Sequence, residues 1–355
     1  MMLLMMTAAL AGCAGDDDSG FTQEDLDTAR AEGKAEGIAE ATPVSTLDTI
    51  IARGSMKCGV KESQYGMGYL DSATGVRSGL DISYCRAVAA ALGLNADFAG
   101  MNFFDGQGIL VRSDVFPYGT GSADQLANAK VCVGVGTTTE GNLVDWFGSR
   151  SIDIEVVGTP DATESVEKLK AGTCDAFTGD MSAMVARKWL LDNDADWAGT
   201  DTHSELWIAQ ELMSKEPLGA ATRDMDSDFK DVVAWVWYGM VTAEEMGVTS
   251  GNYAQMATAA CATVDGGSAT DPGMCRLLTS NLGLGTATNP LDGTWMQAVL
   301  SAAGNYGEAY DDAFCAGDYD GVSGSAAMND CLISRAGTLN ALVSEGGIQY
   351  APAMR

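Results

Sequence analysis

The feature that most constrains the fold of this chain is a pair of short apolar runs, each of which stops at a glycine and a polar residue. Residues 131–135 lead into Gly136 and three threonines, and residues 174–178 lead into Gly179 and Asp180. Each run has the length and composition of a strand, and a helix can begin directly after it. If the two strands lie parallel in one sheet, their carboxyl ends open on the same crevice.

Strands and helices alternate through this part of the chain. We expect strands at 131–135, 153–157 and 174–178, and helices at 139–147, 162–171 and 181–191. This order predicts an α/β fold class with a parallel, doubly wound sheet. Beyond residue 225 the apolar residues recur at helical spacing, and we interpret the aromatic residues at 235–238 as part of a core helix rather than as a ligand box.

The residues at the two strand ends predict a ligand that carries both charges. Thr137, Thr138 and Thr139 lie at the start of a predicted helix, where hydroxyls and backbone N–H groups suit an anion. Asp180 offers a carboxylate, which suits a cation. The small zwitterion that fits such a crevice is a free amino acid.

The composition excludes several classes of function. The chain has 355 residues, 46% of them apolar, which is enough for two domains with packed cores. Its formal net charge of −29, from 49 acidic and 20 basic residues, argues against nucleic acid and against docking on an anionic membrane surface. The single histidine, His203, stands among polar residues. The best match to a calcium loop, at 318–321, lacks ligands at both ends, so we predict no metal and no other cofactor.

The start of the chain is typical of an exported lipoprotein. Residues 1–12 are a short apolar run that ends in small residues, as a signal peptide does, and the run is too short to span a bilayer. Residues 10–13, Leu-Ala-Gly-Cys, resemble a bacterial lipobox in which Cys13 becomes the lipid-attached N-terminus. Residues 13–44 bury little, so we interpret them as a tether. We expect a protein in the periplasm or on the cell surface, held to the membrane by this lipid anchor.

Eight cysteines follow Cys13, and an even number in an exported protein predicts a disulfide framework. Sequence alone allows about a hundred pairings. Neighbourhood along the chain suggests Cys58–Cys85, Cys132–Cys174, Cys261–Cys275 and Cys315–Cys331. We interpret these bonds as structural staples rather than as catalytic or metal-binding groups.

Several stretches, in order along the chain, carry a family resemblance. Among them are Thr46-Leu47-Asp48, Gly79-Leu80-Asp81, Asp105-Gly106-Gln107-Gly108, Gly136-Thr137-Thr138-Thr139-Glu140, Ser214-Lys215-Glu216-Pro217 and Gly304-Asn305-Tyr306-Gly307-Glu308. Together they resemble the periplasmic substrate-binding proteins of polar amino-acid ABC transporters, in particular the general L-amino-acid-binding subgroup. The resemblance covers most of 46–355 and implies the type 2 periplasmic-binding-protein fold, in which two lobes close on the ligand about a hinge.

The resemblance also implies a division of the chain into lobes. Lobe I would be formed by 45–111 and 217–355, the latter including a C-terminal helical extension, and lobe II by 112–216, with crossovers near 109–118 and 212–219. The resemblance supports two of the disulfides, Cys58–Cys85 and Cys132–Cys174.

The resemblance assigns roles to the candidate site residues. Thr137, Thr138 and Thr139 would contact the ligand carboxylate, and Asp180 would hold its ammonium group. The ligand side chain would be contacted from lobe I by Gln64, Tyr65 and Met67.

One stretch that the resemblance leads us to expect is missing. Residues 92–96 run directly into 97–100, whereas in the family a strand, a helix and a strand of lobe I lie between them, with an arginine-bearing loop that clamps the carboxylate. We therefore expect a reduced sheet in lobe I. Arg77, Arg86 and Arg112 are the candidates to replace the missing clamp.

The leading interpretation is a monomeric receptor that binds a free L-amino acid between its lobes and delivers it to an ABC permease in the inner membrane. It makes and breaks no bond, so it is no enzyme. The gap in lobe I favours an alternative, a lipoprotein that has lost its ligand site and acts as an interaction module. A second alternative is a dehydratase or cell-wall lytic enzyme on the same fold, for which the acids would be Asp180 with Glu62 or Glu140.

Overall fold

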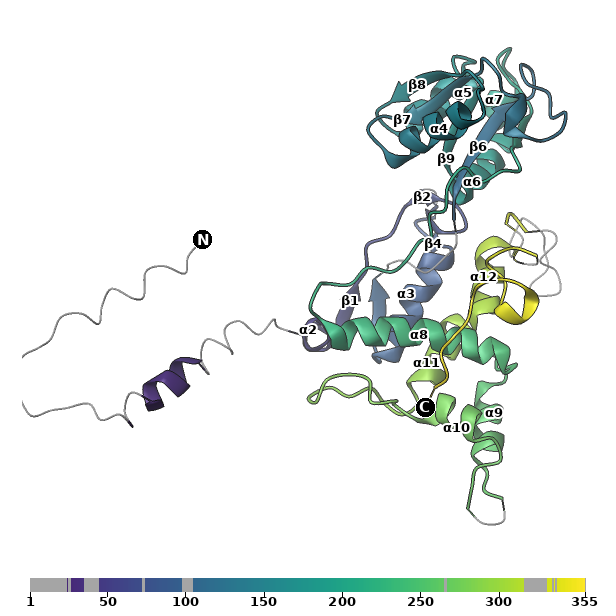
Figure 1. Cartoon of the computed structure of the whole chain (residues 1–355). Helices are drawn as coiled ribbons and strands as arrows, with labels where there is room; N and C mark the ends of the chain where they lie inside the picture. Colours follow the sequence, from purple (N-terminus) through teal and green to yellow (C-terminus); the bar gives the residue numbers. More distant parts are fainter. Residues whose placement is uncertain are drawn as a thin grey trace, which may run out of the picture. The chain divides into compact units, whose positions relative to one another are not determined.

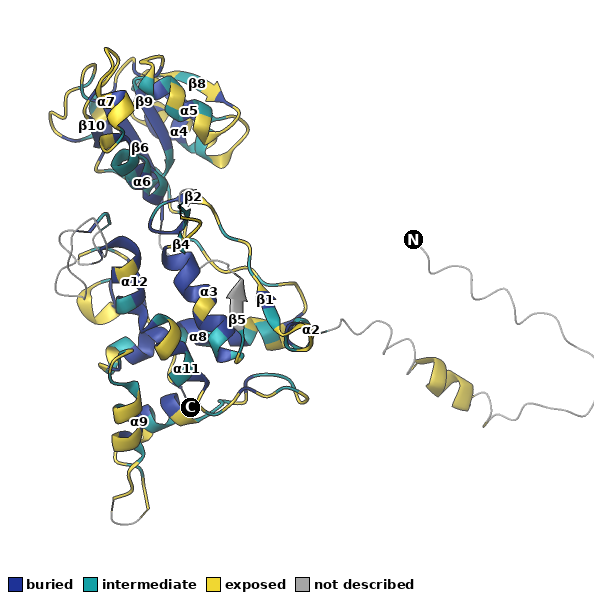
Figure 2. Cartoon of the chain, turned by 180° about the vertical axis from the view of Figure 1, so that it is seen from behind, coloured by how far each residue is buried: buried dark blue, intermediate teal, exposed yellow. Residues whose placement is uncertain are grey.

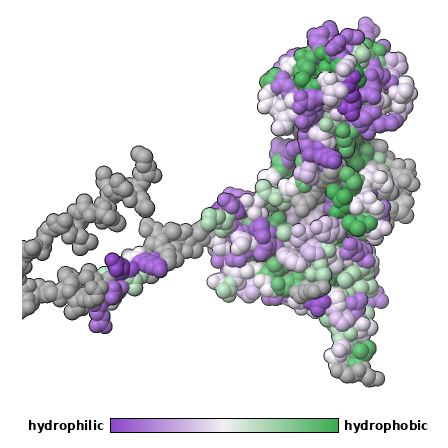
Figure 3. Space-filling model, in the orientation of Figure 1, coloured by the Kyte–Doolittle hydropathy of each residue, from purple (hydrophilic) through white to green (hydrophobic). Residues whose placement is uncertain are grey.

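The computed structural model describes residues 24, 27–34, 45–71, 74–97, 105–264, 267–315, 331–333, 335 and 337–354. The chain divides into two compact units, 1–44 and 45–355, and Figure 1 shows the elements of both. In the first unit, residues 27–34 are helical and exposed, and Figure 3 shows mostly hydrophilic residues on this helix. The predicted signal peptide, Cys13 and most of the predicted tether lie outside the described residues.

A five-stranded sheet organises residues 105–214, which we call the sheet region. Its strands are β6 (Gln107–Arg112), β7 (Lys130–Gly134), β8 (Glu155–Thr159), β9 (Ala176–Asp180) and β10 (Leu206–Ile208), in the order β10-β6-β9-β7-β8. Strand β7 pairs in parallel with β8 and β9, as the alternating pattern predicts. Strand β6 pairs antiparallel with β9 and β10, so the sheet as a whole is mixed; the sequence predicts neither β6 nor β10. The two antiparallel strands lie outside the β-α-β units that enforce parallel pairing.

Helices cover both faces of this sheet. They are α4 (Thr138–Ser149), α5 (Ala162–Lys170), α6 (Met181–Asp192) and the short α7 (Ala195–Ala198), with a 3-10 turn at Ala123–Gln125. Leu143 and Phe147 of α4 pack on one face with Val131, whereas Met184 of α6 packs on the other face with Leu110. Every residue of β6 is buried, as expected of a strand that is covered on both sides, and Figure 2 shows this burial.

Residues 45–97 and 218–354, which we call the helical region, contain mainly helices. These are α2 (Thr46–Arg53), α3 (Leu80–Ala91), α8 (Ser227–Glu245), α9 (Tyr253–Cys261), α10 (Pro272–Thr279), α11 (Trp295–Ala303), α12 (Tyr306–Phe314) and a 3-10 turn at Val343–Glu345. Their apolar faces share one core. The ring of Trp237 on α8 is buried there against Tyr84 and Tyr306, so the core-helix interpretation of 235–238 is confirmed for this residue.

The strands of the helical region are short. Within the described residues, β1 (Ser55–Lys57) and β5 (Asn95–Asp97) form a parallel pair, and β2 (Ser63–Gln64), β3 (Gly68–Leu70) and β4 (Arg77–Ser78) form an antiparallel sheet. Among the described residues this region therefore has only short strands, in keeping with the expected reduction, and its C-terminal part is helical, as expected.

Four disulfides join the pairs that neighbourhood along the chain suggested, Cys58–Cys85, Cys132–Cys174, Cys261–Cys275 and Cys315–Cys331. Cys132–Cys174 ties β7 to the residues just before β9. Among the described residues, no helix combines the length and apolar character that crossing a membrane requires.

Candidate functional site

Asp180 lies at the carboxyl end of β9 and occupies the N-cap position of α6. Its side chain is 28% exposed and forms no capping hydrogen bond. The Lys61 ammonium lies 3.3 Å from its Oδ2 and also donates to Oε1 of Gln64 at 2.6 Å. The cationic group that faces Asp180 in this structure is therefore a side chain of the helical region.

A chain of hydrogen bonds continues from Gln64 into the sheet region. Nε2 of Gln64 donates to Oγ of Ser182 at 2.5 Å, and this hydroxyl donates in turn to Oδ2 of Asp105. Oδ1 of Asp105 accepts from the backbone N–H groups of Gly106 and Ser182 at 2.8 Å and 3.3 Å. Side chains from β2, α6 and the residues before β6 thus form one connected network.

Asp105 is the buried acid of this network. Its side chain is 2% exposed. Burial raises the pKa of the Asp105 carboxyl to about 6, against the opposing effect of the hydrogen bonds from Ser182 and Gly106, and the nearby charge of Asp180 adds to the rise.

The threonine turn lies at the start of α4. Thr137 caps this helix, since its hydroxyl accepts from the backbone N–H of Glu140 at 3.2 Å and donates to the Gly134 carbonyl at 2.7 Å. The Glu140 carboxylate accepts from the backbone N–H of Gly136 at 2.8 Å. Thr137 and Thr138 are exposed and Thr139 is half-buried, so the first turn of α4 faces solvent with the donors that an anion needs.

Gln107 connects this turn to β9. Its Nε2 donates to the Thr139 carbonyl and to the Thr178 hydroxyl, both at 3.0 Å, and it lies directly opposite Asp180 in the β6–β9 register. Its Oε1 is buried and has no partner in the described part of the chain. Because β7 and β9 are parallel neighbours, the threonine turn and Asp180 lie at the same edge of the sheet, as the sequence predicts.

The three residues expected to reach the ligand side chain lie in different surroundings. Gln64 is buried in the network described above. Tyr65 is half-buried and stacks on Trp189 of α6, with 4.6 Å between ring centroids. Met67 is buried in the core of the helical region. Their contact with a ligand stays a prediction.

The candidate arginines also differ. The guanidinium of Arg112 is fully committed to Asp114 and to the carbonyls of Leu169 and Thr202. Arg77 forms an ion pair with Glu62, but its second terminal nitrogen is buried without a hydrogen-bond partner among the described residues. Arg86 is exposed on α3.

A cavity of about 380 Å³ borders the network, with Asp105, Met181 and Ser182 on one side and Thr338 and Asn340 on the other. Asp180 and the three threonines do not line it. Sequence reasoning missed Lys61, Asp105 and Ser182 as members of the network. Asp105 and Gln107 could have been found, because both stand in a motif that carries the resemblance, Asp105-Gly106-Gln107-Gly108.

Comparison with known proteins identifies relatives over nearly the whole chain. The glutamate/glutamine/aspartate/asparagine-binding protein BztA of Rhodobacter capsulatus is 32% identical over 359 residues, covering 90% of this chain and 96% of that protein. The general L-amino acid-binding periplasmic protein AapJ of Rhizobium johnstonii is 30% identical, covering 89% and 95%. A periplasmic binding protein of an ABC transporter from Brucella ovis, solved with glutathione bound, has a TM-score of 0.68 at 26% identity, covering 88% of this chain and all of that one. No family model matches the chain.

The alignment with BztA also bears on the missing stretch. Ninety per cent of 355 residues is about 320, so about 40 of the 359 aligned positions have no counterpart in this chain. A gap of this total length is enough for the strand–helix–strand unit that the resemblance finds missing. With the two-lobed fold, the sequence motifs and these relatives in agreement, the chain belongs to the family of periplasmic amino-acid-binding proteins of ABC transporters.

Proposed function

We propose that the protein binds a free L-amino acid at the edge of the sheet where β7 and β9 end, and delivers it to an ABC permease in the inner membrane. Asp180 would hold the ammonium group and the start of α4 the carboxylate. The observation that carries the proposal is the placement of a half-buried carboxylate and an exposed helix N-terminus on adjacent parallel strands.

The Lys61 ammonium occupies the position that we assign to the ammonium of the ligand. The side chain of Lys61 is 55% exposed, so it can leave Asp180 for water at little cost, because exposed ion pairs contribute about 0–1 kcal/mol. A bound amino acid would then replace an interaction of Asp180 rather than bury a new charge.

We assign a supporting role at the carboxylate to Arg77. It is the candidate arginine whose guanidinium keeps a buried nitrogen without a partner among the described residues, whereas that of Arg112 is fully committed. Arg77 stands on β4, in the same small sheet as Gln64.

The specific alternative is a protein whose ligand site has been lost. Two ion pairs favour it, Asp180 with Lys61 and Glu62 with Arg77. In both pairs a side chain of the protein itself, and not a ligand, balances the charge of the acid. The curated relatives are binding proteins rather than enzymes, and the ring of His203 packs against that of Trp197, with 4.9 Å between centroids. We further propose a monomer that is anchored through a lipid on Cys13.

Calorimetric titration of the full chain with the common amino acids tests the proposal. A ligand at about 100 times its dissociation constant should also raise the free energy of unfolding by about 2.7 kcal/mol. Asp180→Asn should abolish binding, whereas Asp153→Asn, at an exposed aspartate near the start of β8, should not. Folded protein that shows neither heat nor stabilisation with any amino acid would support the lost-site alternative instead.

A further inference from the structure

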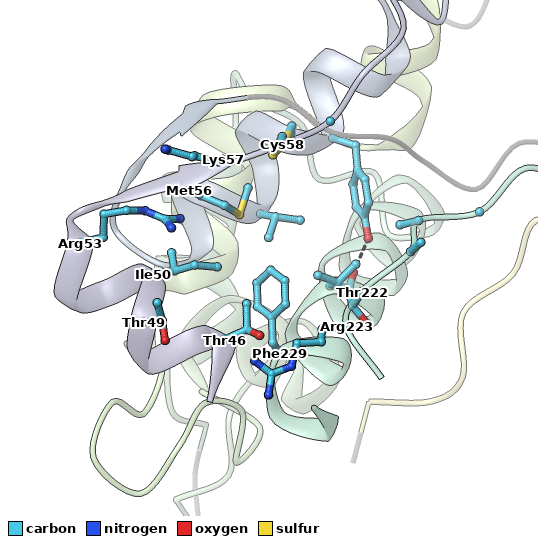
Figure 4. Close-up of a pocket in the computed structure, with 18 residues that line it drawn as sticks. Thr46, Thr49, Ile50, Arg53, Met56, Lys57, Cys58, Thr222, Arg223 and Phe229 are labelled. Carbon is cyan, nitrogen blue, oxygen red and sulfur yellow. Dashed lines mark hydrogen bonds between the residues drawn. A yellow bond between two sulfur atoms is a disulfide. The ribbon is translucent and has the colours of Figure 1, made fainter. Parts of the chain in front are cut away.

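A second cavity, of about 660 Å³, lies in the helical region. Its walls come from α2, β1, α3, the loop at 219–223 and the start of α8, and Figure 4 shows the ring of Phe229 standing at its centre. None of the candidate amino-acid site residues lines it.

The floor of this cavity is apolar. Ile50, Met56, Tyr84, Val88 and Val233 line it, and each is at most 9% exposed. The Cys58–Cys85 disulfide completes this wall. A hydrocarbon group placed here would therefore leave water for an apolar surface.

The charged residues of the lining are all basic. Arg53, Lys57 and Arg223 line the cavity and are exposed, and no acidic residue lines it. This excess of basic residues is opposite to the composition of the whole chain, which has 49 acidic and 20 basic residues. No ion pair within the described residues joins any of the three. Nε of Arg53 donates to the Ser55 carbonyl at 2.9 Å, and Arg223 lies near Asp226, whose Oδ2 already accepts from the Thr46 backbone.

We propose that this cavity binds a small carboxylate with an apolar body, such as a medium-chain acyl anion. The carboxylate meets Arg53 and Arg223 at the rim, and the hydrocarbon lies on the floor around Phe229. The volume falls within the range of about 300–1,000 Å³ that is usual for small-molecule sites. An amino acid is a poor occupant, because its ammonium group would find cations and no carboxylate in the lining.

The test is calorimetric titration of the full chain with decanoate, with 1-decanol and acetate as matched probes. Decanoate should bind about tenfold or more tightly than decanol, because a charge-assisted hydrogen bond to arginine is stronger than a neutral one. Acetate should give no measurable binding, since it leaves the floor empty. Equal affinity for decanoate and decanol, or no binding of decanoate, would overturn the proposal.

Variants locate the bound molecule. The double variant Arg53→Gln/Arg223→Gln should weaken decanoate about tenfold or more and leave decanol unchanged, whereas Arg150→Gln, at an arginine that covers Trp146 in the sheet region, should alter neither. Thr222→Trp should block both probes, and unchanged far-ultraviolet circular dichroism would show that the variant is folded. Decanoate binding that survives both changes refutes the site. A dimer that decanoate dissociates in sedimentation analysis would instead identify a second copy of the chain as the occupant, which also overturns the proposal.

Discussion

Replacing Asp105 by asparagine should change how the stability of this protein depends on pH. In the wild-type structure the carboxyl group is 2% exposed and accepts from Ser182 and from two backbone N–H groups. Asparagine keeps an oxygen for the backbone donors and resembles the protonated acid in size and charge. The variant therefore removes one titration and leaves the other titrating groups in place.

The sign and size of the effect follow from the pKa of Asp105. Burial raises this pKa from 3.8 to about 6, so the folded state binds the proton more tightly than the unfolded state does. The stabilisation that this proton provides is complete below about pH 4 and is lost as the pH rises through 6. Two pKa units correspond to roughly 3 kcal/mol, so Asp105→Asn should gain about that much over the wild type between pH 4 and pH 7.

Urea denaturation of both proteins at several pH values measures this difference directly. Asp48→Asn is a control of opposite sign, because hydrogen bonds from Asn289 and Thr286 lower the pKa of Asp48. The stabilisation that Asp48 provides is lost as the pH falls below about 4, so the wild type should gain over that variant as the pH rises towards 4. If the difference in unfolding free energy between Asp105→Asn and the wild type does not change with pH, the raised pKa of Asp105 and the burial that causes it are refuted.

Three further changes test other parts of the structure. Glu244→Gln should cost about 3–5 kcal/mol of unfolding free energy in urea, because it strands Arg335, whose side chain is 2% exposed and pairs with Glu244 through two nitrogens; a loss below 1 kcal/mol would contradict this. Cys132→Ala/Cys174→Ala should lower the free energy of unfolding by about 2–4 kcal/mol. Under reducing conditions the variant and the wild type should denature at the same urea concentration. Lys61→Met should raise amino-acid affinity up to about fivefold, whereas Lys188→Met, at a lysine that pairs with Asp192, should not; weaker binding by the Lys61 variant would show that the lysine assists the ligand.

The sheet region could be predicted closely because its boundaries depend on local chemistry. Thr137 and Asp161 cap α4 and α5 through their own side chains, so these helices begin within a residue of their predicted starts. The direction of β6 and β10 depends instead on where the chain enters and leaves the sheet, and the local sequence of a strand does not determine this. The parallel prediction therefore holds for β7, β8 and β9, whereas β6 and β10 are not predicted from the sequence.

The candidate site divides in the same way. Asp180 and the threonine turn follow strands of one β-α-β series, so their placement at one sheet edge follows from the sequence. Lys61 and Gln64 meet Asp180 and Ser182 across separations of 119 and 118 residues. Such contacts arise only when the two regions pack together. The resemblance singles out Gln64 as a ligand contact but does not predict its bond to Ser182, and nothing in the sequence singles out Lys61.

The contacts of Lys61 give Asp180 a second role beside the one that we propose for it at the ligand. Lys61 bonds to both Asp180 and Gln64, and Gln64 is bonded through Ser182 to Asp105. An ammonium group that displaces Lys61 from Asp180 therefore disturbs one end of a network that holds the residues of β2 against α6. If the ligand binds at Asp180 as we propose, its binding and the contact between the two regions are linked, because the ligand ammonium replaces the Lys61 ammonium at Asp180.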